Sequence, residues 1–154
     1  MASRKRVIAG AVAVVLAVAI AHYALRGCGE TEEDRVAKVV TAIEKAIEDH
    51  SLGGVLEHVS ERYRDREGVT KAEARGILLY YFHAHKTIEV TITSKIAVTL
   101  RKDESAVAVF YARLAESKPE VLTGGGEAFR FELDFKKEDG AWRVVSHRRE
   151  PAPR

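Results

Sequence analysis

Apolar residues recur with a helical period in the first half of the chain. The first group comprises Val36, Val39, Val40, Ile43 and Ile47. This spacing places one apolar stripe along a helix, which Thr31 or Asp34 would cap at its start. Ser51 opens a short second helix, residues 52–59, whose Gly53-Gly54 pair weakens the pattern.

A capping box predicts the start of a third helix. Thr70 and Glu73 stand at the spacing that lets each side chain bond the backbone of the other. The apolar face that follows consists of Ala74, Ile77, Leu78, Tyr81 and Phe82. The helix is expected to bury this face and to end near His85.

Beyond residue 87 the period changes from 3.6 to 2. Every even position from Ile88 to Leu100 except Ser94 is apolar, which predicts one long strand with one buried face. A turn at 101–105 leads to an inner strand over 106–114. The apolar–polar alternation returns at 129–135, and Glu138-Asp139-Gly140 makes a hairpin turn into a last strand that ends near Arg149. Three helices followed by about four antiparallel strands form an α+β pattern.

The C-terminal hairpin is similar to that of a known superfamily. Its residues are Phe131-x-Leu133-x-Phe135-x-x-Glu138-Asp139-Gly140-x-Trp142-x-Val144-Val145-Ser146. With the order of helices and strands over residues 32–150, this ending resembles the nuclear-transport-factor-2-like superfamily. The resemblance implies a cone fold, in which three helices pack on a curved antiparallel sheet with the tryptophan buried.

The N-terminus has the pattern of an export signal or membrane anchor. Arg4, Lys5 and Arg6 precede a mostly apolar run over residues 7–25. As a helix, this run would rise roughly 28 Å, close to the hydrocarbon thickness of about 30 Å. The preceding positive charges place the N-terminus in the cytoplasm and the domain outside it. We therefore expect a single-pass bacterial inner-membrane protein with a periplasmic or otherwise extracytoplasmic domain.

Two alternatives to a retained anchor remain open. One is cleavage of the leader after Ala21, which ends a small-x-small pattern. Alternatively, Leu25-Arg26-Gly27-Cys28 resembles a bacterial lipobox, with Cys28 as the lipidation candidate, although Arg26 departs from the small residue expected there. The expected organisation is a leader over 1–28, a linker over 29–33, the domain over 34–150 and a tail over 151–154.

The charge distribution argues against a nucleic-acid partner. Four of the 25 basic residues lie in the leader, which leaves 21 against 23 acidic residues beyond Cys28. A nucleic-acid surface would require a dense basic stripe instead. The expected partners are the membrane, an envelope protein, or a second copy bound through the sheet face.

Catalytic residues are scarce in the pattern. Enzymes of the resembled superfamily place Asp, His, Tyr or Arg inside the cone, whereas the apolar faces of 88–100 and 129–135 carry no ionisable residue. His83 is a weak acid/base candidate at a helix end, beside Tyr80. No metal or cofactor set is evident, and His50, His58 and His147 are interpreted as surface or strand-end groups. An aromatic pocket between sheet and third helix would be lined by Tyr80, Tyr81, Phe110, Phe131 and Trp142, if these do not simply form the core.

These observations favour a non-catalytic domain that binds a partner protein or a small apolar ligand. Two alternatives remain. One is an enzyme similar to polyketide cyclases, dehydratases or isomerases. The other is an assembly component of the envelope or of a secretion system.

Overall fold

The computed structural model describes residues 29–116 and 127–153. The chain divides into a unit that ends at Thr31 and a second unit from Glu32 to Arg154. All helices and strands described below belong to the second unit. No helix within the described ranges has the length and apolarity needed to cross a membrane. The predicted anchor at 7–25 and Cys28 lie outside the described residues.

The three described helices follow the predicted order. They are α2 (Glu32–Glu48), α3 (Leu52–Leu56) and α4 (Lys71–Ala84). The predicted capping box is present, since Thr70 accepts from the backbone of Glu73 while the Glu73 side chain accepts from the backbone of Thr70. Helix α2 begins at Glu32, inside the segment expected to be a linker.

The sheet has five antiparallel strands. They are β1 (Ile88–Ile92), β2 (Ala97–Leu100), β3 (Ser105–Glu116), β4 (Glu127–Glu138) and β5 (Ala141–Pro151). Their order is β1-β3-β4-β5, and β2 pairs with the same strand, β3, as β1 does. The predicted inner strand is confirmed as β3. The last strand reaches Pro151, inside the segment expected to be a tail.

The prediction of one long strand over 88–100 is wrong. Ile92 pairs with Ala112 and Ala97 pairs with Val109, so four residues of the edge face two of β3. Within this interruption, the Ser94 hydroxyl accepts a hydrogen bond from the Tyr111 backbone in place of a strand partner. The surplus of two residues preserves the alternation, which explains why the sequence pattern looks continuous.

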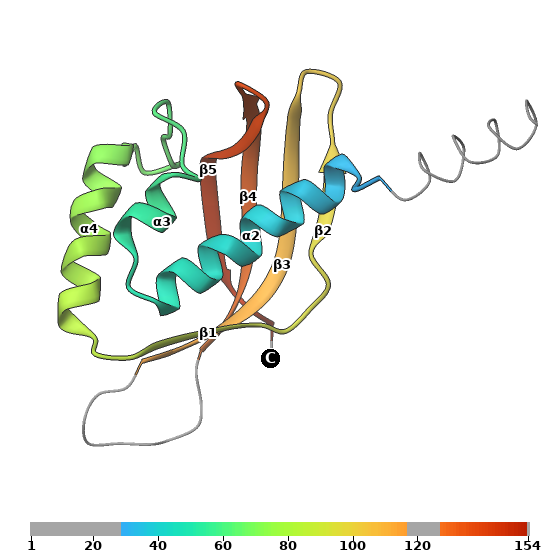
Figure 1. Ribbon diagram of the computed structural model, residues 1–154. Helices are drawn as coiled ribbons and strands as arrows, with labels where there is room; N and C mark the ends of the chain where they lie inside the picture. Colours follow the sequence, from blue (N-terminus) through green and yellow to red (C-terminus); the bar gives the residue numbers. More distant parts are fainter. Residues whose placement is uncertain (1–28, 117–126, 154) are drawn as a thin grey trace, which may run out of the picture. The chain divides into compact units, whose positions relative to one another are not determined.

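Helix α2 provides the main cover of the sheet. Figure 1 shows it lying across one face, which we call the concave face. The core beneath it includes Val36 and Val40 from α2, and the small side chains of Ala106 and Ala108 on β3 let the helix approach closely. Trp142 and Val144 on β5 complete this core and are 6 % and 4 % exposed.

Helix α4 buries the apolar face predicted for it only in part, since Ala74, Leu78, Tyr81 and Phe82 are partly buried and Ile77 is exposed. No residue along α4 is buried, and Ile77 and Tyr80 are 58 % and 76 % exposed. The reason is its position, since α4 packs mainly on α3 and stands to one side of the sheet (Figure 1). The expected packing of all three helices on the sheet is therefore wrong for α4.

Candidate functional site

A β-bulge in β5 determines which of its side chains face the helices. Phe135 pairs with Val144, but the next pair along is Asp134 with Ser146, so Val145 is an extra residue. One extra residue reverses the alternation beyond it. His147 therefore shares the concave face with its partner Leu133, and Arg149 shares it with Phe131.

The segment after α3 runs beside β5 and brings a tyrosine to this face. The Ser60 backbone N–H donates to the Val144 carbonyl at 2.9 Å, and the Arg64 N–H donates to the Val145 carbonyl at 3.0 Å. Val59 also forms a parallel bridge with Val144. These contacts fix Tyr63 between two anchored residues, and it is buried at 7 % exposure.

Buried Tyr63 and partly buried His147 form a polar pair. Oη of Tyr63 lies 2.5 Å from Nδ1 of His147, and the two rings are nearly parallel. Burial raises the pKa of Tyr63 to about 12, so its hydroxyl keeps its proton. Burial also lowers the pKa of His147 and so favours the neutral imidazole. The negative charge of Asp65 acts in the opposite direction and raises this pKa, but its effect is smaller.

This geometry determines the chemistry that His147 offers. When the tyrosine hydroxyl donates to Nδ1, the remaining ring proton of the neutral imidazole resides on Nε2. Within the described part of the chain, no group bonds Nε2. His147 can therefore donate one hydrogen bond from the concave face to a bound molecule.

Aromatic side chains lie on the same face of the sheet as His147. We call Phe110, Phe129, Phe131 and Leu133 the aromatic wall. Phe110 and Phe131 stack with ring centroids 5.5 Å apart, and Phe129 meets Phe131 edge-on at 6.3 Å. The Arg149 guanidinium lies 4.6 Å from the centre of the Phe129 ring. Phe129, Phe131 and Leu133 are only partly buried, so the wall is incompletely covered.

The five predicted pocket residues separate in the structure. Phe110 and Phe131 lie together in the aromatic wall. Tyr80 points to solvent, and Tyr81 packs against His85 with ring centroids 4.5 Å apart. Trp142 belongs to the core beneath α2.

His83 makes its hydrogen bond within its own helix and not with the aromatic wall. It is exposed on α4, and its Nδ1 lies 2.8 Å from the carbonyl oxygen of Leu79, one turn earlier in the same helix. Its ring is thus paired with its own helix. No group of three or more His, Cys, Asp or Glu side chains within the described ranges is arranged to hold a metal ion.

Glu132 is a paired charge on the other side of the sheet. Arg130 and Arg148 both donate to its carboxylate, at 3.2 and 2.9 Å, and Glu150 lies near both arginines. These residues occupy the side of β4 and β5 opposite the aromatic wall. They form a charge ladder and present no isolated carboxylate.

The residues that the pattern missed are Tyr63, His147 and Arg149. Strict alternation from Trp142 and Val144 places His147 on the outer face, whereas the bulge places it on the concave face, so the prediction of a surface or strand-end group is wrong for His147. The available signal was the adjacent pair Val144-Val145, because two successive apolar residues in an alternating strand can mark a bulge. Tyr63 lies in a segment without a periodic pattern.

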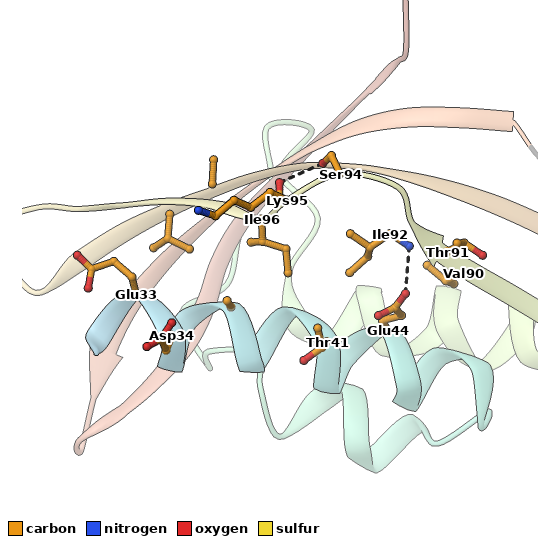
Figure 2. A pocket seen from close by; sticks show the side chains of 13 residues that line it. Glu33, Asp34, Thr41, Glu44, Val90, Thr91, Ile92, Ser94, Lys95 and Ile96 are labelled. Carbon is orange, nitrogen blue, oxygen red and sulfur yellow. Dashed lines mark hydrogen bonds between the residues drawn. The ribbon is translucent and has the colours of Figure 1, made fainter. Parts of the chain in front are cut away.

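A second feature lies at the sheet edge, between α2 and strands β1 and β2. It is an open groove of about 770 Å³, and Figure 2 shows the side chains that line it. Its helix side carries Glu33, Asp34 and Glu44, and its strand side includes Ile92 and Ile96. The Glu44 carboxylate accepts a hydrogen bond from the Ile92 backbone at 3.2 Å.

Comparison with known proteins identifies the fold through solved structures. No protein-family model and no curated protein sequence matches the chain. A candidate scytalone dehydratase from Novosphingobium aromaticivorans aligns with a TM-score of 0.69 and 10 % identity, over 77 % of this chain and 83 % of that one. A nuclear-transport-factor-2-like protein from Salmonella enterica serovar Typhimurium aligns with a TM-score of 0.66 and 10 % identity, over 79 % and 92 %.

A third similar structure belongs to a larger protein. Bd1075 of Bdellovibrio bacteriovorus aligns with a TM-score of 0.66 and 9 % identity over 77 % of this chain, which spans only 40 % of that protein. At these identities the comparisons establish the architecture alone. The domain has the nuclear-transport-factor-2-like cone fold.

Proposed function

We propose that the concave face binds a small, flat, apolar molecule that carries one hydrogen-bond acceptor. The observation that carries this proposal is His147, whose Nε2 has no hydrogen-bond partner among the described residues and which shares the concave face with the partly exposed rings of Phe129 and Phe131. Small-molecule sites combine an apolar lining with a few placed polar groups, and this face has both. Arg149 adds a cation near Phe129, which favours an acidic or carbonyl oxygen on the ligand.

The aromatic wall supports the ligand shape. Partly exposed Phe131 stacks on buried Phe110, so a planar ligand can extend the stack on Phe131 or meet Phe129 at its edge. Because Tyr63 holds the imidazole through Nδ1, the donor direction at Nε2 is set before the ligand arrives. Such preorganisation reduces the entropy lost on binding.

The direct test is a titration of the full-length chain with 2-naphthoate, followed by NMR of the His147 ring and the Phe131 backbone. We expect shifts at both residues, and weaker binding in Phe131→Ala and His147→Asn. His83→Asn is the matched control, since it removes an exposed histidine on α4. No shift at millimolar 2-naphthoate, or equal weakening by the control, would contradict the proposal.

A second candidate is a proton-transfer enzyme such as a dehydratase. The Tyr63–His147 pair favours it, because an oriented imidazole is the usual acid/base group of such reactions. In this case His147→Asn and Tyr63→Phe would abolish turnover of a substrate that the unmodified chain converts. Binding without turnover in every substrate tested would leave the domain as a binding module.

We also propose that residues 7–25 remain attached and anchor the domain at the bacterial inner membrane. The supporting features are the length of the apolar run and the basic cluster before it. Intact-mass measurement of the membrane fraction tests this. A mature N-terminus at His22 would show cleavage, and an acylated N-terminal Cys28 would show a lipoprotein.

A further inference from the structure

One edge of the sheet is formed by β1 and β2, and β3 lies on only one side of them. The Thr93 N–H donates to Tyr111 and the Arg101 N–H donates to Ser105, both at 2.8 Å. Antiparallel strands alternate between residues that bond their neighbour and residues that face away. The even-numbered residues of both strands therefore direct their backbone groups away from β3.

The two parts of this edge differ. On β1, the outward N–H groups of Val90 and Ile92 donate to the carboxylates of Glu48 and Glu44, at 3.1 and 3.2 Å. On β2, the outward groups belong to Val98 and Leu100. No strand within the described residues pairs with β2 on that side. An uncapped edge offers backbone donors and acceptors to another strand.

The groove beside this edge has a distinct charge. It contains Glu33, Asp34 and Glu44 from α2, against a single cation, Lys95. Ile96 and Val98 supply apolar surface between them and the strand backbone. Figure 2 shows Glu33 and Asp34 on the helix, across from Lys95 and Ile96. The groove therefore has a ladder of backbone groups on one side and net negative charge on the other.

We propose that the β2 edge binds an extended segment of a partner protein in which apolar residues alternate with lysine or arginine. The backbone would add a strand beside β2, and because side chains alternate between the two faces of a strand, the basic side chains would lie on the groove side and the apolar ones on the opposite face. The aliphatic parts of the basic side chains would cover Ile96 and Val98, with their charged ends near Glu33 on α2. A second copy of this chain is disfavoured, because a two-fold contact uses the same patch twice and would set one acidic wall against another.

The test uses the full-length chain and a short fluorescein-labelled peptide of alternating lysine and valine. A glutamate–valine peptide of the same length is the charge control. Fluorescence polarisation measures affinity, and NMR shifts at Ile96, Val98 and Leu100 locate the contact. We expect the lysine peptide to bind there, the glutamate peptide to bind at least roughly tenfold more weakly, and salt to reduce the difference.

Val98→Pro isolates the backbone contribution. Proline removes the outward N–H at a position that does not donate to β3, so the β2–β3 pairing remains. We expect roughly tenfold weaker peptide binding than in the matched control Val98→Ala, which keeps the N–H. If Val98→Pro does not fold, Glu33→Lys provides the test at an exposed helix position. It should weaken binding of the lysine peptide and strengthen binding of the glutamate peptide.

Three results would overturn the proposal. The first is the absence of lysine-peptide binding at millimolar concentration. The second is binding that neither Val98→Pro nor Glu33→Lys changes. The third is concentration-dependent shifts at Val98 and Leu100 without peptide, which would assign the edge to a second copy of this chain.

Discussion

The indole Nε1 of Trp142 donates a hydrogen bond to Oε2 of Glu32, 2.8 Å away. Lys137 donates to the same carboxylate oxygen at 2.9 Å. The hydrogen bond from Lys137, followed by that from Trp142, lowers the pKa of Glu32. The first residue of α2 is thereby tied to the strands of the C-terminal hairpin, and the buried indole keeps a partner for its only polar atom.

Trp142→Ala should destabilise the domain by about 3–5 kcal/mol, because it removes a large core side chain. Trp142→Phe should cost less, since a ring remains and only part of the volume and the N–H are lost. Urea denaturation of the full-length chain, followed by circular dichroism, measures both. A loss below about 1 kcal/mol for Trp142→Ala would mean that the side chain is not part of the core.

The stability of the domain should depend on pH through His147. Its pKa is lowered in the folded state by burial, so the unfolded chain binds the proton more readily near pH 6.5. The corresponding stability is fully present above about pH 6.5 and declines as the pH falls through the lowered folded-state value. Denaturation midpoints measured from pH 8 to pH 5 should show this decline.

The variant His147→Asn should flatten the profile in that window, whereas His83→Asn should leave it unchanged. The lowered pKa values of Glu32, Glu73 and Glu138 act in the same direction but only below about pH 4.5, so they do not obscure it. An unchanged profile in His147→Asn would assign the decline to another group.

Two glycines should respond to alanine with opposite signs. Gly76 lies inside α4 with no atom within 4 Å of an added Cβ, so Gly76→Ala should stabilise the domain by about 0.5–1 kcal/mol. Gly140 has φ of +80° in the hairpin turn, so Gly140→Ala should destabilise it by about 1–2 kcal/mol. Thermal denaturation of the two variants side by side checks both signs. Equal shifts would show that neither backbone argument holds.

His83→Ala should be neutral for stability and for binding on the concave face. The side chain is exposed and bonds only the Leu79 carbonyl among the described residues. We expect a change within about 0.5 kcal/mol in urea denaturation, as for most surface substitutions. Loss of 2-naphthoate binding in this variant would return His83 to the candidate site.

How well the sequence predicts the fold depends on whether each strand irregularity changes the face on which the later side chains lie. The interruption between β1 and β2 adds two residues relative to β3, so Ile88 and Leu100 keep the same face and the inward set was predicted correctly. The bulge in β5 adds one, Val145, so everything beyond it changes face. Periodicity detects neither irregularity, but only the second one hides a functional candidate.

Helix α4 shows a different limit. Its capping box was predictable because it depends on residues three apart. Its incomplete burial depends on where α3 directs the chain, and this is a tertiary property. The pair of Tyr63 and His147, 84 positions apart, likewise arises from the segment after α3 running alongside β5.

The bulge at Val145 matters for the partner of the histidine more than for the histidine itself. Deleting Val145 would restore regular pairing and leave His147 opposite Leu133 and Arg149 opposite Phe131. It would also remove the Val145 carbonyl that accepts a hydrogen bond from the Arg64 N–H, next to Tyr63. A regular strand would therefore still present the imidazole inward, but it would lose one anchor of the tyrosine that orients it.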